Sequence, residues 1–118
     1  MFSNIDEAIA ATNHERAITL CYTCIEGLFK SFIIKNIPAQ QSMNEIVEMA
    51  REIKVYIHGL NIYPEEVTNS IISTANLINN TRNKYSESHF NHQADNTLSI
   101  YIRDLTNSLS KLLIHHMN

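Results

Sequence analysis

The chain has 118 residues, which is enough for one domain with a single hydrophobic core and too few for two. Its formal charge is −3, from nine Lys and Arg against twelve Asp and Glu, and this excludes a broad basic surface for nucleic-acid phosphates. No apolar run approaches the roughly 20 residues of a membrane span, and "MFSNIDEAIA" lacks the pattern of a signal peptide. We therefore expect a cytoplasmic protein with no membrane partner.

Two helices are predicted in the first third of the chain. Apolar residues at helical spacing indicate a short opening helix over residues 5–11. Thr12 and Glu15 match a capping box, so a second helix is expected to begin there and to run to about Asn36. Its buried stripe is expected to contain Ile18, Cys21, Ile25, Leu28, Phe29, Phe32 and Ile33.

The middle of the chain contains turn and cap signals that separate further helices. Pro38 ends the long helix, and Ser42 with Glu45 offers a second capping box. Gly59 suits a left-handed helix terminus, and Pro64 suits the first position of the next helix. The expected stripes are Ile46, Met49, Ala50, Ile53 and Ile57; then Val67, Ile71, Ala75 and Ile78; then Leu98, Ile102, Leu105, Leu109, Leu112 and Leu113.

These segments predict an all-α fold. Only two Gly and two Pro are present, which is few for an all-β protein, and no segment of useful length has the period of a strand. We expect one domain over residues 1–118, a helical bundle of four main helices plus a short N-terminal helix.

Cys21 and Cys24 form a C-x-x-C pair inside a predicted helix. A zinc site needs two further ligands, and a redox pair needs a turn between a strand and a helix. A spacing of three places both thiols on the buried stripe, so we expect structural cysteines. The use of the pair as a metal or redox site remains the alternative.

The other histidines give weaker signals. His89 and His92 have H-x-x-H spacing, which is half of a metal site, and we expect neither a metal nor a cofactor. His14 and His58 fall at predicted helix ends, where a structural role is expected. His115 and His116 are expected to be solvated.

The polar stretch "RNKYSESHF", residues 82–90, interrupts the run of amphipathic helices. Arg82 carries a permanent cation at the end of one predicted helix, and His89 carries a group that titrates near neutrality. Together they can act on a phosphodiester without a metal, because Arg neutralises the developing charge while His moves a proton. Asn83, Tyr85 and Ser86 can supply hydrogen bonds.

A structural interpretation of the same stretch is available. Arg82 and Lys84 suit the negative end of a helix dipole, and Ser88 can cap the helix that follows.

Two stretches stand out in the wider sequence, "AITLCYTCIEGLFKSFI" and "NSIISTANLINNTRNKYSESHF", and the second is followed by a long leucine-rich helix. Together they resemble the abortive-infection C-terminal domain family, a bacterial phage-defence module related to the HEPN all-helical superfamily. The most specific positions are Glu26 and the block that contains Arg82, Asn83 and His89.

The resemblance implies a helical homodimer in which two copies of an Arg-x6-His motif face each other. In active members of the family this arrangement forms a metal-independent endoribonuclease. By the same resemblance, His89 would be the general acid and base, Arg82 would hold the scissile phosphate, and Asn83 would support the geometry. Glu26 would lie beneath them and pair with Arg82.

This chain departs from the usual form of the block, because Ser86, Ser88 and Phe90 stand where the family commonly has glycines. Two functions therefore stay open: an RNA-cleaving phage-defence domain, or a non-catalytic dimerisation or partner-binding module. The partner of such a module would be a separate antitoxin or sensor protein.

Overall fold

The computed structural model describes residues 2–85 and 94–117. They form α1 (Phe2–Ala10), α2 (His14–Asn36), the 3₁₀ turn η1 (Pro38–Gln40), α3 (Ile46–His58), α4 (Glu65–Tyr85) and α5 (Asn96–His115). The predicted all-α fold is confirmed: a short N-terminal helix and four longer packed helices, with no strand among the described residues.

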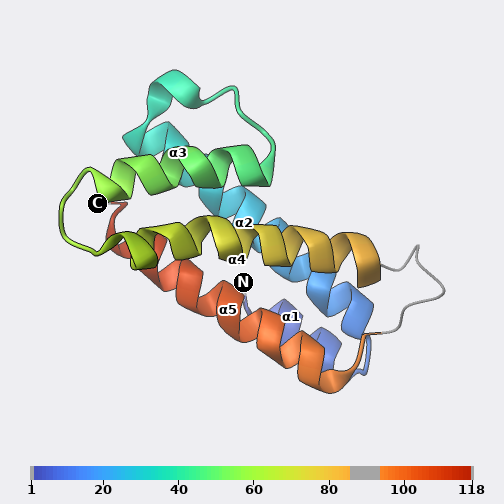
Figure 1. Cartoon of the computed structure of the whole chain (residues 1–118). Helices are drawn as coiled ribbons and strands as arrows, with labels where there is room; N and C mark the ends of the chain where they lie inside the picture. Colours follow the sequence, from blue (N-terminus) through green and yellow to red (C-terminus); the bar gives the residue numbers. More distant parts are fainter. Residues whose placement is uncertain (1, 86–93, 118) are drawn as a thin grey trace.

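The long helix α2 is the centre of the fold, because it packs against each of the other four α-helices. Figure 1 shows α2 passing behind α4, with α3 on one side and α1 and α5 on the other. Its side chains Ile25, Phe29 and Phe32 are completely buried. The full stripe predicted for this helix is buried: Ile18, Cys21, Ile25, Leu28, Phe29, Phe32 and Ile33.

By length and composition, α2 meets the criterion for a membrane-spanning helix, with a mean hydropathy of 1.5 over its most apolar 18 residues. This corrects the expectation that no segment approaches a span. In this fold 44% of that window is buried inside the domain, so the apolar face of α2 packs on other helices. A helix at the centre of a domain core is also long and apolar, and it therefore meets the same criterion.

The cap predicted for α2 is wrong by one residue. Thr12 has a positive φ of 58° and belongs to the turn, with its hydroxyl donating to the carbonyl of Ala11 at 2.7 Å. Asn13 is the N-cap, and its Oδ1 accepts from the backbone N–H of Arg16 at 3.2 Å. Asn and Thr side chains both accept this bond at an N-cap, so the residue preference for N-caps did not distinguish Asn13 from Thr12.

Three other turn predictions also need correction. Helix α3 begins after Glu45 with no side-chain hydrogen bond at its cap, so Ser42 and Glu45 form no capping box. Gly59 keeps a right-handed φ of −65°, and the positive φ falls on Asn61 instead. Pro64 precedes α4, and its carbonyl accepts the first backbone bond, from Val67.

The buried faces of α4 and α5 contain hydroxyls where aliphatic residues were predicted. In α4 Thr68 is buried and Val67 is exposed. In α5 Ser99, Thr106 and Ser110 are buried, whereas Leu98, Leu105 and Leu112 are half-buried. Thr106 donates to the carbonyl of Ile102 at 2.8 Å, and Ser110 donates to that of Thr106 at 2.7 Å. Small hydroxyls satisfied by their own helix can occupy the face of α5 that packs on α2.

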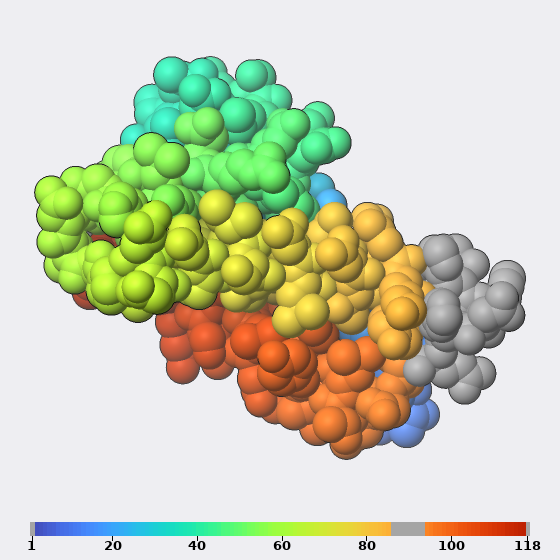
Figure 2. Space-filling view, viewed as in Figure 1, coloured from blue at the N-terminus to red at the C-terminus, as the bar shows by residue number. Residues whose placement is uncertain are grey.

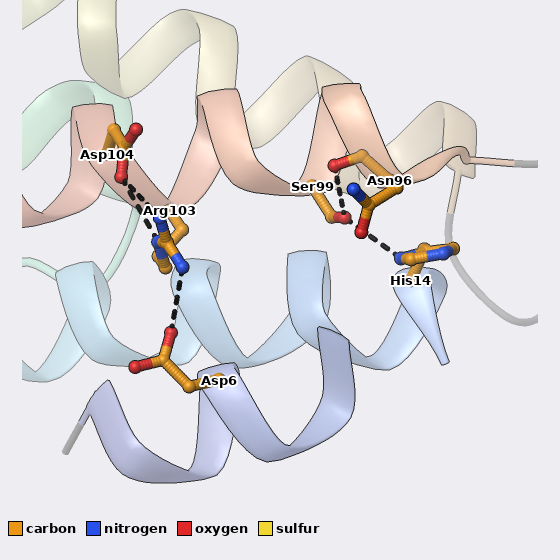
Figure 3. Close-up of polar contacts among 6 residues, drawn as sticks. All are labelled: Asp6, His14, Asn96, Ser99, Arg103 and Asp104. Carbon is orange, nitrogen blue, oxygen red and sulfur yellow. Dashed lines mark hydrogen bonds and ion pairs between the residues drawn. The ribbon is translucent and has the colours of Figure 1, made fainter. Parts of the chain in front are cut away.

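Two polar contacts tie α5 to the N-terminal part of the chain (Figure 3). The guanidinium of Arg103 pairs with Asp6 of α1 at 3.1 Å and with the neighbouring Asp104 at 3.0 Å. At the start of α5, Ser99 Oγ lies 2.9 Å from Nδ1 of His14, the first residue of α2. These contacts hold α1 and the beginning of α2 against α5.

Candidate functional site

Arg82 lies in the last turn of α4, as the sequence predicts. Its guanidinium carbon is 4.3 Å from the centroid of the Tyr22 ring, so the cation stacks on an aromatic face contributed by α2. Arg82 and Tyr22 are both half-buried. The contact fixes the end of α4 against the first half of α2.

A pocket of about 340 Å³ opens beside this stack. It lies where the first turn of α3, the last turns of α4 and one face of α2 meet. Figure 2 shows the surface notched between the N-terminal end of α3 and the C-terminal half of α4. The lining residues are Tyr22, Asn44, Glu45, Ile46, Val47, Asn79, Arg82 and Asn83.

The pocket is polar and carries one charge of each sign. Arg82 supplies the cation and Glu45 the anion, and among the described residues neither side chain forms an ion pair. The first turn of α3 has no side-chain cap, so the positive end of its dipole contributes further positive potential beside Ile46 and Val47. The pocket can therefore bind a ligand that carries both an anionic group, attracted by Arg82, and hydrogen-bond donors, attracted by Glu45.

Two of the predicted catalytic residues, Arg82 and Asn83, line this pocket. Tyr85 ends α4, half-buried, with Nζ of Lys84 5.9 Å from its ring centroid. His89 and Ser86, together with Glu87, Ser88, Phe90 and His92, lie outside the described residues.

Glu26 is not seen to pair with Arg82. It lies on α2, one turn beyond Tyr22, and is half-buried. Within residues 2–85 and 94–117 no ion pair joins its carboxylate to the Arg82 guanidinium, which stacks on Tyr22 instead. Arg82 thus contacts an aromatic ring, whereas the resemblance implies a carboxylate partner.

Four polar residues of the pocket were not predicted as site residues from the sequence: Tyr22, Asn44, Glu45 and Asn79. A signal for Asn79 was present, because it precedes Arg82 by three and Asn83 by four and so shares their helix face. Glu45 was assigned, with Ser42, to a capping box, and no role was predicted for Asn44. Tyr22 comes from a distant segment, and only the packing of α2 against α4 brings it to the site.

The cysteines are placed for a structural role. Cys21 is fully buried, and burial raises the pKa of its thiol to about 11, although a hydrogen bond with Thr106 opposes this rise. Cys24 is half-buried, and burial also raises its pKa, against a hydrogen bond with Ser110. Both thiols therefore stay protonated near neutral pH. In the described part of the chain no group of three or more His, Cys, Asp and Glu side chains gathers in metal-binding geometry.

The remaining described histidines lie at helix ends. His14 contacts Ser99, and Nδ1 of His58 lies 3.3 Å from the hydroxyl of Thr68. His116 was expected to be solvated, but its Nε2 lies 2.7 Å from the hydroxyl of Tyr63, and burial lowers its pKa. Each of these contacts joins a helix end to another segment of the chain.

Comparison of the chain with protein families, with characterised proteins and with solved structures finds no match.

Proposed function

We propose that this domain is a metal-independent endoribonuclease of the abortive-infection type, with the Arg82 pocket as its phosphodiester site. The observation that carries the proposal is the stacking of Arg82 on Tyr22 at the edge of a polar pocket. Stacking uses the face of the guanidinium, whereas its five N–H groups lie in its plane. The edge of Arg82 can therefore donate to phosphate oxygens while its face rests on the ring.

The chemistry needs a proton carrier as well as a cation, and His89 is the residue proposed for it. The 2′-hydroxyl beside the scissile phosphate gives its proton to His89, and the 2′-oxygen bonds to phosphorus. The bond from phosphorus to the 5′-oxygen breaks, and that oxygen takes a proton from a protonated His89, supplied by the second copy in a homodimer. The products are a 2′,3′-cyclic phosphate and a 5′-hydroxyl. Arg82 stabilises the charge that develops on the phosphorane.

The negative net charge of the chain does not oppose this function, because the proposal needs local contacts at one phosphodiester. Asn79 and Asn83 share the Arg82 face of α4 and add amide donors and acceptors at the same place. Such a site suits single-stranded RNA, whose bases and phosphates are both accessible. We also propose a cytoplasmic location, because cellular RNA is present there.

The test is cleavage of total bacterial RNA in the presence of EDTA, with the product ends mapped. His89→Ala should lower the rate at least about 100-fold, which is the usual contribution of a general acid or base. His115→Ala is the matched control, because His115 is an exposed histidine in the last turn of α5. Its rate should equal that of the wild type. Wild-type protein that is folded but inactive would contradict the proposal.

The second candidate is a non-catalytic module that dimerises or binds an antitoxin or sensor protein. Several large apolar side chains are exposed: Ile34, Val55, Leu60, Ile62, Val67, Leu77, Tyr101 and Ile114. Such residues are common on the surfaces of monomeric proteins, so the polar pocket is the stronger observation. Sedimentation equilibrium measures the oligomeric state, for which a dimer is expected if the chain is the ribonuclease or a dimerisation module.

A further inference from the structure

We propose that the Arg82 pocket selects guanine and that the carboxylate of Glu45 reads the base, an assignment that rests on the ribonuclease function proposed above. Glu45 is the N-cap residue of α3 and lines the same pocket as Arg82 of α4. The two opposite charges thus come from different helices and belong to one cavity.

The two charges of the pocket attract different parts of a ligand. A phosphate is attracted by the Arg82 guanidinium and repelled by the Glu45 carboxylate. In the residues that the structure describes, no hydrogen bond or ion pair engages the carboxylate of Glu45, and α3 does not use it as a side-chain cap. It is therefore available to accept hydrogen bonds from the part of the ligand that carries donors.

Guanine is the base whose edge fits a carboxylate best. Its N1–H and its N2 amino group point the same way and can donate to the two oxygens of one carboxylate. Adenine and cytosine each place an amino group beside an acceptor nitrogen, and uracil places its single N–H between two carbonyls. Each of these three bases sets at least one lone pair against the negative charge, so only guanine gives a fully matched pair.

The other polar groups of the pocket support binding without setting the choice of base. Asn44 and Asn79 each offer an amide donor and an amide acceptor, which suit any base. The volume of about 340 Å³ falls within the roughly 300–1,000 Å³ typical of small-ligand pockets. A nucleotide held at its phosphate by Arg82 and at its base by Glu45 would use both charges at once.

Binding of the four nucleoside 3′-monophosphates, measured by titration calorimetry, tests the base preference without requiring catalysis. Guanosine 3′-monophosphate should bind about tenfold tighter than the other three, a discrimination typical of one bidentate pair. Glu45→Gln should remove this preference, because an amide replaces one acceptor oxygen with a donor. Glu48→Gln is the matched control, an exposed acid in the first turn of α3 that does not line the pocket, and it should keep the preference.

The outcomes separate this inference from the proposed function. Equal binding of all four nucleotides, together with RNA cleavage at positions unrelated to guanosine, would overturn the role of Glu45 and leave the ribonuclease standing. Selective binding of the guanosine nucleotide without RNA cleavage would support the guanine pocket and overturn the ribonuclease. Neither binding nor cleavage by folded protein would overturn both. Because Glu45 is exposed, Glu45→Gln should fold normally, and circular dichroism checks this.

Discussion

The guanidinium of Arg82 rests on the ring of Tyr22, with 4.3 Å between its carbon and the ring centroid. The two residues are 60 positions apart in the chain and are brought together by the packing of α4 on α2. The stack holds the cation in one orientation at the pocket and leaves its N–H edge available. The packing of α4 on α2 thus sets the position of the cation on which the proposed chemistry depends.

Replacing the ring should weaken RNA binding by a modest and measurable amount. Without the ring the Arg82 side chain has to be ordered when RNA binds, which costs about 0.5–1 kcal/mol, so Tyr22→Leu should raise KM for RNA roughly two- to fivefold. Tyr22→Phe keeps the aromatic face and should behave like the wild type. If the Phe variant loses as much as the Leu variant, the hydroxyl of Tyr22 matters and the stack does not.

A stabilising substitution is expected at Gly27, which lies exposed in the middle of α2. A Cβ built at this position meets no atom within 4 Å, and its φ is not in the left-handed region. Gly27→Ala should therefore raise the free energy of unfolding by about 0.5–1 kcal/mol, because Ala loses less backbone entropy in a helix. Urea denaturation measures the change, and a lower stability would show that this face of α2 requires a glycine.

The contact between Ser99 and His14 should contribute to stability. Ser99 is fully buried, and its Oγ lies 2.9 Å from His14 Nδ1. Ser99→Ala removes this bond and should lower the free energy of unfolding by about 1 kcal/mol. Ser108→Ala, on an exposed position of the same helix, should change it by less than about 0.5 kcal/mol. Equal effects of the two substitutions in urea denaturation would contradict a role for the contact.

The buried thiol of Cys21 predicts a loss of stability at alkaline pH. Its pKa is raised from an ordinary value of 9.0 to about 11 in the folded chain, so the unfolded chain loses the proton first as pH rises. The contribution of the protonated thiol is thus complete below about pH 9 and is lost as pH rises to about 11. Urea denaturation across this window should show a steeper decline for the wild type than for Cys21→Ala. Equal declines in stability for the wild type and Cys21→Ala would contradict a raised pKa for the Cys21 thiol.

The helices themselves were predictable because their apolar residues recur at helical spacing, as in the stripe from Ile18 to Ile33. The turns were less predictable. Thr12 and Asn13 are adjacent and both suit a cap, and Gly59 was favoured over Asn61 although Asn also tolerates a positive φ. The burial of Ser99, Thr106 and Ser110 was not predicted, because hydrophobic patterning counts a hydroxyl residue as polar. A hydroxyl that bonds to its own helix can nevertheless pack like an apolar group.

The site was predictable only where it is local in the chain. Arg82 and Asn83 stood out because they interrupt an amphipathic pattern. Tyr22 and Glu45 carry no local signal, since their approach to Arg82 depends on how α2, α3 and α4 pack. Residues contributed by distant segments follow from the fold and not from their sequence neighbours.

The most direct measurement is the single-turnover cleavage rate of a short single-stranded RNA in EDTA, compared between the wild type, Arg82→Ala and Arg51→Ala. Arg51 is an exposed arginine on α3 away from the pocket lining, so it controls for the loss of one positive charge. We predict that Arg82→Ala lowers the rate about 100-fold or more, as the loss of a charge-stabilising donor does, while Arg51→Ala stays within twofold of the wild type. Equal rates for the two variants, or no cleavage by folded wild type, would contradict the assignment of Arg82 to a phosphodiester site.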